Sequence, residues 1–309
     1  MNNLCVDLGW RSINKYGEQL CGDRVQIVEP SADSVVMVLA DGLGSGVKAN
    51  ILSTLTSKII STMMASNMTL ENCVQTIADT LPVCDVRKVA YSTFTIIRME
   101  HNEYAELIQY DNPLVILLRD GKNYDYEKTA MEIGGKTIYK SKIKLQENDT
   151  FITTSDGAIH AGVGMSLNFG WQRENIIEFM EMIYDKEFTA KTLATILLDE
   201  CNKLYGYQPG DDTTAVCVKV RERCCVNLMI GPPSKPEDLA KMHEAFFSAP
   251  GKRIVCGGTT STLAAEYLKK PIIAQLDYLD SDIPPTAKVE GLDLVTEGVI
   301  TMSKGVEYA

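Results

Sequence analysis

Three aspartates stand at the ends of apolar segments, each beside a glycine or a second acid. Asp41 and Asp156 directly follow such segments, and Asp211 shortly precedes one. Three like charges brought to one point would repel one another, so a shared cation is the natural resolution. Oxygen ligands without a paired His or Cys favour Mg²⁺ or Mn²⁺ over Zn²⁺. The spacing therefore predicts a site for hard divalent cations.

The turn after Asp41 allows two other interpretations. Gly42, Gly44 and Gly46 could open a dinucleotide-binding helix, although that fingerprint requires the spacing G-x-G-x-x-G. Asp41 could also simply end a strand and cap the turn. In the same way, all three acids could be turn and capping residues in a protein without a metal.

Histidines contribute little to this constellation. His101 and His243 lie in segments unrelated to the acids. His160 is close in sequence to Asp156, but a lone surface histidine explains it equally well.

Composition narrows the class of protein. The 309 residues suffice for one large domain or two ordinary ones. A net charge of -11 argues against nucleic acid or anionic lipid as the main partner. The nine cysteines are odd in number and form no C-x-x-C pair, which is typical of reduced thiols in the cytoplasm. Because no apolar run approaches membrane-spanning length, we expect a soluble cytoplasmic protein with no membrane of its own.

Hydrophobic periodicity supplies the elements that must position the acids. Three strands precede two helices, a three-stranded antiparallel meander follows, and a strand, two helices and a last strand complete the first part. A further extended stretch is expected over residues 134–143. The expected strands are 4–10, 24–28, 35–40, 90–99, 104–110, 114–119, 150–154 and 214–220, and the expected helices are 51–64, 70–81, 172–184 and 190–204.

After Arg221 the pattern changes, which predicts a domain of residues 1–222 and a small α/β domain of residues 223–309. The second domain carries a Gly257-Gly258 turn before a helix. Exposed backbone N–H groups there could hold a phosphate or nucleotide, but we favour a simple helix cap by Thr259, Thr260 or Ser261. The domain itself is expected to serve in dimerisation, which would make a homodimer, or in recognising a partner.

Four motifs in order resemble the metal-dependent protein phosphatase family of the protein phosphatase 2C type. The similarity is to its bacterial branch, typified by the sporulation stage II protein E phosphatase, and spans residues 4–221. It includes Tyr91-Ser92-Thr93. The motifs are Gly22-Asp23, Asp41-Gly42-Leu43-Gly44-Ser45-Gly46, Ser155-Asp156-Gly157 and Gly210-Asp211-Asp212-Thr213-Thr214.

This resemblance implies a fold and a set of metal ligands. The fold is an α-β-β-α sandwich of two antiparallel sheets, with the metals at one edge. Asp41 would bridge two Mn²⁺ or Mg²⁺ ions, with the Gly42 carbonyl on the second ion and Asp156 and Asp211 on the first. Asp211 matches the first acid of the family's D-[DN]-x-T motif.

Two neighbouring acids receive secondary roles from the same resemblance. Asp212 either binds a third ion or only shapes the turn. Asp23 matches the second acid of the family's Glu-Asp pair, which holds metal-bound water, but Gly22 stands where the Glu would be.

The implied reaction is hydrolysis of phosphoserine or phosphothreonine on a protein by metal-activated water, without a phosphoenzyme. Relatives in this branch often act on phosphorylated anti-sigma-factor antagonists. Leu43 replaces the histidine general acid of eukaryotic members, and Lys15 or Arg11 is our candidate for the phosphate-binding cation. The alternative is a catalytically inactive relative that binds a phosphoprotein or acts as a scaffold.

Overall fold

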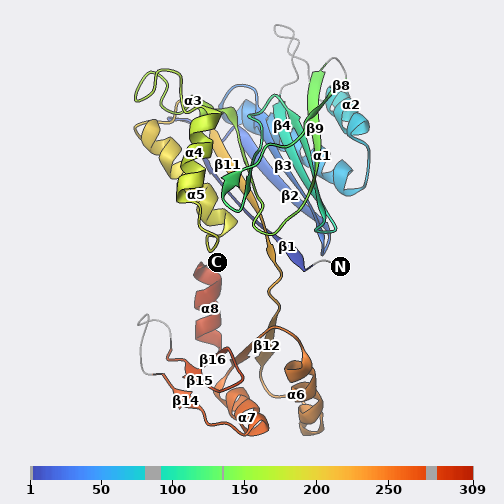
Figure 1. The fold of residues 1–309 in the computed structure, drawn as a ribbon, viewed down its shortest axis with the longest axis vertical. Helices are drawn as coiled ribbons and strands as arrows, with labels where there is room; N and C mark the ends of the chain where they lie inside the picture. The colour runs from blue at the N-terminus through green and yellow to red at the C-terminus, as the bar shows by residue number, and fades with distance from the viewer. Residues whose placement is uncertain (1–2, 81–91, 134–135, 276–283, 309) are drawn as a thin grey trace. The chain divides into compact units, whose positions relative to one another are not determined.

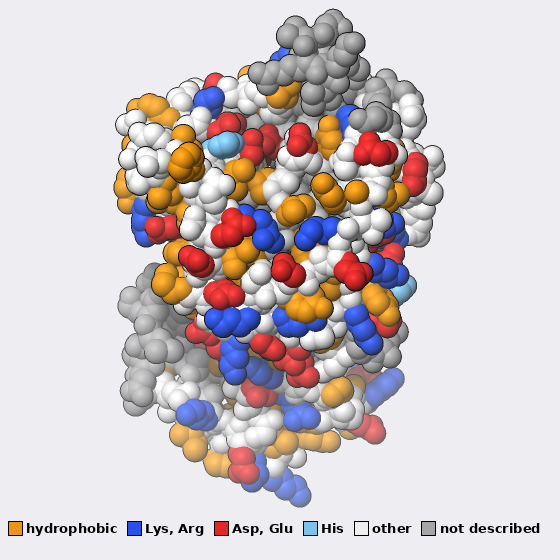
Figure 2. Space-filling view, turned by 45° about the horizontal axis from the view of Figure 1, so that its top comes forward, with side chains coloured by type: hydrophobic (Ala, Val, Ile, Leu, Met, Phe, Trp, Pro, Cys, Tyr) orange, Lys and Arg blue, Asp and Glu red, His pale blue; other side chains and the backbone are white. Residues whose placement is uncertain are grey.

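The computed structural model describes residues 3–80, 92–133, 136–275 and 284–308, which form two compact units, Met1–Glu222 and Arg223–Ala309. The expected strand residues 90 and 91, including Tyr91, and the last residue of the helix expected to end at Leu81 lie outside the described residues. Figure 2 shows acidic and basic side chains interspersed over the visible face, so the net negative charge is not gathered there in one block.

Two antiparallel sheets build unit 1 (Figure 1). The first has the strand order β1-β11-β10-β6-β7 and the second β2-β3-β4-β5-β9-β8. The first contains β1 (Leu4–Ile13), β6 (Ile116–Arg119), β7 (Lys122–Asn123), β10 (Thr150–Thr154) and β11 (Thr213–Glu222). The second contains β2 (Asp23–Ser31), β3 (Ser34–Gly42), β4 (Ser92–Glu100), β5 (Tyr104–Tyr110), β8 (Thr129–Ile133) and β9 (Lys136–Lys144).

Strand β3 shows how the layers form. Its side chains alternate between two faces, as in any strand. Met37 and Leu39 enter the core between the sheets, where they join Phe151 and Val218 of the other sheet. Val36 and its alternate neighbours enter a second core beneath the outer helices. A strand buried on both faces explains the uninterrupted apolar run in the sequence.

Helices cover the outer faces of both sheets (Figure 1). On the β2–β5 sheet lie α1 (Gly46–Ala65) and α2 (Leu70–Thr80), and on the other sheet α4 (Arg173–Ile183) and α5 (Ala190–Leu204). The short α3 (Asp156–His160) follows β10. No described helix is both long and apolar enough to cross a membrane. The four-layer α-β-β-α sandwich predicted from the sequence is confirmed.

Unit 2 is a small α/β fold around a sheet of order β12-β13-β16-β15-β14, whose first three strands are parallel. The sequence did not predict the α8 helix in this unit. The elements are β12 (Val226–Ile230), η1 (Pro236–Asp238), α6 (Leu239–Ser248), β13 (Lys252–Cys256), α7 (Gly258–Leu268), β14 (Ile273–Ala274), β15 (Ala287–Lys288), β16 (Leu294–Thr296) and α8 (Val299–Tyr308).

Candidate active site

Asp41 lies at the carboxyl end of β3, between two hydrogen-bonded neighbours. In the antiparallel register it stands opposite Asp23 of β2 and opposite Thr93 of β4. The Ser92 hydroxyl donates a 2.7 Å hydrogen bond to the Asp41 carbonyl oxygen, which fixes the chain before the glycine turn. The pairing with β2 therefore places two carboxyl groups side by side at one edge of this sheet.

The other two acids come from the second sheet. Asp156 follows β10 and Asp211 precedes β11, and these antiparallel neighbours bring their ends to the same edge because Thr154 pairs with Ala215. The Ser155 hydroxyl then donates a 2.7 Å hydrogen bond to Asp23 Oδ2 on the first sheet. This bond joins the two edges, so the four predicted aspartates converge on one region.

Burial and mutual charge raise the pKa values of Asp23, Asp41 and Asp211. Burial, followed by the charges of Asp23, Asp156 and Asp211, raises the pKa of Asp41 to about 9. A hydrogen bond to Asp156 adds to the effect. Burial and then the charge of Asp156 raise the pKa of Asp211, and burial raises the pKa of Asp23 to about 7. A cluster of this kind favours the binding of either protons or cations.

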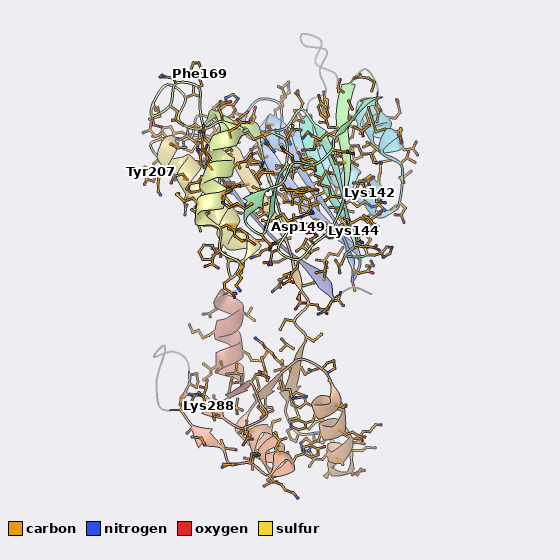
Figure 3. The ribbon with its side chains drawn as sticks, viewed as in Figure 1. Lys142, Lys144, Asp149, Phe169, Tyr207 and Lys288 are labelled. Atoms are coloured by element: carbon orange, nitrogen blue, oxygen red, sulfur yellow. The ribbon has the colours of Figure 1, made fainter. Side chains whose placement is uncertain are left out.

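A buried acid elsewhere in unit 1, Asp149, has the cationic partner that the aspartate cluster lacks. Asp149 is fully buried, and Arg119 pairs with both its oxygens, Nε to Oδ1 at 2.8 Å and Nη2 to Oδ2 at 3.1 Å (Figure 3 labels Asp149). Among the described residues, no Lys or Arg forms a salt bridge with Asp23, Asp41 or Asp211. A buried carboxylate is costly unless it is paired or coordinates a metal.

The donor set fits a hard divalent cation. Asp23 is only 4% exposed, and its Oδ1 has no hydrogen-bond partner within the described structure. Orphaned oxygens of this kind, together with converging carboxylates, match the oxygen ligands that Mg²⁺ and Mn²⁺ prefer. Among the described residues, no group of three or more His, Cys, Asp or Glu side chains is arranged closely enough to hold a metal ion as the structure stands. The arrangement is thus a convergence of acids that a cation would draw together.

The glycines of the turn have steric reasons to be glycine. A Cβ on Gly42 would lie 2.1 Å from the Ala49 carbonyl oxygen, because the first turn of α1 packs directly against this position. Gly44 and Gly46 have φ angles of 103° and 66°, which side chains disfavour. Gly157 likewise faces the Asp212 carbonyl oxygen, 2.2 Å from its would-be Cβ. Close packing at both edges therefore requires the glycine in each Asp-Gly pair.

Asp212 explains why Gly22 departs from the family pattern. Its two carboxylate oxygens accept hydrogen bonds from the backbone N–H groups of Lys15 and Gly22, at 3.0 and 2.9 Å. A Cβ on Gly22 would lie 2.8 Å from Asp212 Oδ2. The Asp212 side chain therefore occupies the space into which a longer residue at position 22 would extend. Asp212 shapes the turn, whereas the Asp211 side chain accepts only the N–H of Asp212 among the described residues.

The two candidate cations behave differently. Burial and Asp156 raise the pKa of Asp211 and the Lys15 charge partly offsets that rise, while the Lys15 backbone N–H bonds Asp212, so this lysine lies beside the acids. Arg11 instead forms a 2.6 Å salt bridge with Asp199 of α5.

Leu43 packs against the core beneath α1 and offers no proton. His160 Nε2 lies 3.9 Å from Asp156 Oδ2, so it borders the site.

Sequence reasoning assigned no role to two residues that position the acids, Ser155 and Tyr205. Ser155, besides its bond to Asp23, accepts a 2.9 Å hydrogen bond from the Thr214 N–H. Tyr205 of the segment after α5 donates a 2.7 Å hydrogen bond to the Gly157 carbonyl oxygen. Ser155 could have been suspected from its place beside Asp156, but nothing in the sequence connects Tyr205 to this edge.

A cleft of about 660 Å³ borders Asp156, one of the four acids. Its lining includes Asp156 and Ile159 of α3, Lys136 and Tyr139 of β9, and the loop residue Asn112. Burial lowers the pKa of Lys136. The cleft thus offers a cation, an amide and aromatic surface next to Asp156.

The sequence matches the family described as Stage II sporulation protein E (SpoIIE) over residues 31–221. No curated protein matches it significantly. Among solved structures, the SpoIIE phosphatase domain from Bacillus subtilis is 19% identical, with a TM-score of 0.56 over 73% of this chain and 96% of that chain. The RsbU and RsbW domains of a Mycobacterium tuberculosis protein are 14% identical, with a TM-score of 0.60 over 79% and 69%. The S. agalactiae serine/threonine phosphatase is 13% identical, with a TM-score of 0.52 over 70% of this chain and 99% of that chain.

Proposed function

Because the chain belongs to the SpoIIE family of PP2C-type phosphatase domains, we propose that it is a metal-dependent serine/threonine protein phosphatase. The observation that carries the proposal is the convergence of Asp23, Asp41, Asp156 and Asp211 at one edge of the sandwich without a pairing Lys or Arg among the described residues. The fold similarity supports the same class of protein.

We assign the acids individual roles within this proposal. Asp41 and the Gly42 carbonyl would face two Mn²⁺ or Mg²⁺ ions from one sheet, and Asp156 and Asp211 would hold one of these ions from the other. When bound, such a pair lowers the pKa of a water and neutralises charge on the phosphoryl group. Asp23, with its free oxygen, would accept a hydrogen bond from water. A third ion at Asp212 is not part of the proposal, because both its oxygens accept backbone N–H groups.

Lys15 and the cleft would bind the substrate. Lys15 is the cation beside Asp211, and we place the substrate phosphate between it and the acids. The cleft beside Asp156 would hold the peptide that carries the phosphoserine or phosphothreonine. Leu43 carries no proton, so solvent would protonate the leaving hydroxyl oxygen.

Exposed apolar residues near α3 support a protein substrate. Between α3 and α4, Met165 and Phe169 are 63% and 83% exposed, and Tyr207 after α5 is 68% exposed. Figure 3 shows Phe169 and Tyr207 projecting outward on the same side of unit 1. Exposed apolar groups of this kind are typical of protein contact surfaces. We therefore propose a protein as the substrate, and the similarity to the RsbU and RsbW domains leads us to propose a phosphorylated regulatory protein of the anti-sigma-factor-antagonist type.

We also propose that the protein acts in the cytoplasm. The described cysteines are free thiols, which suits a reducing compartment.

The test compares two asparagine variants. Asp41→Asn removes the acid at the centre of the cluster, whereas Asp199→Asn removes an exposed acid whose surface ion pair is worth less than about 1 kcal/mol. We expect Mn²⁺-dependent phosphate release from p-nitrophenyl phosphate and from a phosphothreonine peptide. Asp41→Asn should lower the turnover by about a thousandfold or more, comparable with the loss of an essential electrostatic group, and Asp199→Asn should leave it unchanged.

A second readout separates the phosphatase from an inactive relative. Mn²⁺ should raise the unfolding temperature of the wild type and of Asp199→Asn, but not that of Asp41→Asn. Metal stabilisation without turnover would support the phosphoprotein-binding alternative. Turnover that survives in Asp41→Asn would contradict the assigned site.

A further inference from the structure

A second cavity lies wholly within unit 2, at the carboxyl ends of its parallel strands. Its volume is about 730 Å³, in the range of pockets for small ligands. Three loops line it: Gly231-Pro232 after β12, Gly257-Gly258 after β13 and Glu297-Gly298 after β16. In open α/β sheets, ligands bind in the crevice at this end of the strands.

The helix after β13 presents an uncapped N-terminus to this cavity. We expected Thr259, Thr260 or Ser261 to cap it, and this is wrong. The N-cap residue is Gly257, with φ of 100° and no side-chain capping bond. The Ser261 and Thr262 hydroxyls instead donate backward, to the carbonyl oxygens of Gly257 and Gly258. The first N–H groups of α7 therefore have no side-chain acceptor and stand at the lining of the cavity.

Thr260 gives an independent sign of a ligand. Thr260 is 2% exposed and lines the cavity, and no hydrogen bond of its hydroxyl is found within the described residues; because its oxygen is not among the fully enclosed unpaired atoms, it opens into the cavity. Oγ1 lies 3.5 Å from the position of a Cβ on Gly257, so it points toward the glycine turn. A hydroxyl that opens into a cavity and has no protein partner is available to donate or accept a hydrogen bond from a ligand. A Cβ on Gly258 would meet no atom within 4 Å, which leaves room for a group above the helix end.

The remaining walls indicate the rest of the ligand. Ile230 of β12 and Met302 and Val306 of α8 line the cavity although their side chains are 61%, 39% and 76% exposed. The Cys256 thiol lies 3.7 Å from the Met302 sulfur, which holds α8 against the end of β13. Glu297 provides a single carboxylate after β16, the strand that pairs with β13. The cavity thus combines an apolar wall, one acceptor and a set of N–H donors.

We propose that this cavity binds a nucleoside monophosphate or diphosphate. The phosphate would accept hydrogen bonds from the α7 N–H groups and from Thr260, as anions do at helix N-termini. The base would pack against the apolar wall, and Glu297 would accept hydrogen bonds from the sugar hydroxyls. No Lys or Arg lines the cavity among the described residues, and a helix N-terminus supplies only about half a positive charge, which favours few phosphates.

The test uses the full chain carrying Asp41→Asn, in EDTA, so that the acidic site of unit 1 neither binds metal–nucleotide complexes nor hydrolyses the probe. Isothermal titration calorimetry with AMP, ADP, GMP and GDP is compared with titrations of inorganic phosphate and adenosine. We expect at least one nucleotide to bind at least tenfold more tightly than phosphate and adenosine.

Three variants locate the binding. Gly258→Glu places a negative charge at the helix N-terminus, which helices tolerate well but an anion does not. It should weaken nucleotide binding more than tenfold, whereas the matched control Gly258→Ala should change it less than threefold. Thr260→Val removes only the hydroxyl and should weaken binding about fivefold.

Several results would overturn the proposal. They are the absence of saturable binding by any of the four nucleotides, phosphate binding as tight as the best nucleotide, and nucleotide binding that survives both Gly258→Glu and Thr260→Val. Because these titrations contain no metal and no substrate, their failure would leave the proposed phosphatase untouched.

Discussion

Two strand-to-helix junctions in this chain share a glycine turn, but one suits a cation and the other an anion. In unit 1, β3 ends at a glycine turn that opens α1, and in unit 2, β13 ends at a glycine turn that opens α7. At the first junction Asp41 and its neighbours surround the turn with carboxylates. At the second, the lining offers backbone N–H groups and hydroxyls with one acid, Glu297.

A strand–glycine–helix turn therefore does not determine by itself which ligand binds to it. A helix N-terminus alone attracts anions. In unit 1 this tendency is overcome by acids that come from other strands, Asp23 by pairing with β3 and Asp156 across the sandwich. In unit 2 the neighbouring strand ends add only one carboxylate. The ligand class is therefore decided by the tertiary neighbours of the turn.

Alanine at the two turns should separate them most sharply. At Gly42 a Cβ would lie 2.1 Å from the Ala49 carbonyl oxygen, so Gly42→Ala must displace α1 and should lower the free energy of unfolding by about 3 kcal/mol. At Gly258 a Cβ meets open space, and Gly258→Ala should change stability by less than about 1 kcal/mol, in the stabilising direction. Urea denaturation of both variants measures this. Equal losses would show that the two turns are packed alike.

Lys15 is the cation that would bind the substrate phosphate at the acidic junction. Lys15 lies beside Asp211, whereas Arg11 is engaged with Asp199. Lys15→Ala should lower kcat/KM for a phosphothreonine peptide by about 30-fold, or about 2 kcal/mol of transition-state binding. Arg11→Ala is the matched control and should stay within twofold. If the two variants lose the same activity, Lys15 has no particular role at the phosphate.

The cluster of aspartates should also make the stability of the metal-free protein fall as the pH rises. An acid whose pKa is raised in the folded state stabilises the fold while it is protonated, so this contribution is present below pH 4 and is lost as the pH rises to about 9. Asp41→Asn removes it. In EDTA the variant should gain on the wild type by at least about 1.5 kcal/mol between pH 5 and pH 9, which is the worth of a single unit of the pKa rise.

Chemical denaturation of wild type and Asp41→Asn across this pH range measures the difference, and Asp199→Asn serves as the control. A difference that stays constant with pH would mean that the pKa of Asp41 is not raised in the folded state, and the comparison with the junction of unit 2, which has a single acid, would lose its electrostatic basis.

The sequence predicted the local part of these sites better than the tertiary part. Asp41 and Asp156 could be placed because apolar strands ending in Asp-Gly are visible in the chain, and the sandwich followed from the motifs and was confirmed. The helix cap at Gly257 could not be predicted, because hydroxyls after a glycine turn can accept N–H bonds or donate backward, and packing decides between them. Helix α8 was also missed, since Gly298 and Gly305 interrupt a short pattern.

The smallest expected effect concerns a residue that joins the two sheets at the acidic edge. Ser155 donates to Asp23 and accepts from the Thr214 N–H, so it holds a buried acid of one sheet against the strand ends of the other. Ser155→Ala should cost about 1 kcal/mol of stability, the net worth of such a bond. The hydrogen bond from Ser155 lowers the pKa of Asp23, so the loss of this bond should raise that pKa.

That rise should move the acidic limb of the pH profile of kcat for phosphate release to higher pH. Ser57→Ala, which removes a buried hydroxyl that donates to the Thr54 carbonyl oxygen within α1 and is not a partner of Asp23, is the control and should leave the limb in place. A purely structural Ser155 would lower stability without moving the limb. The pH dependence of the acidic junction would then be set by its carboxylates alone, whereas ligand binding at the second junction depends on backbone N–H groups.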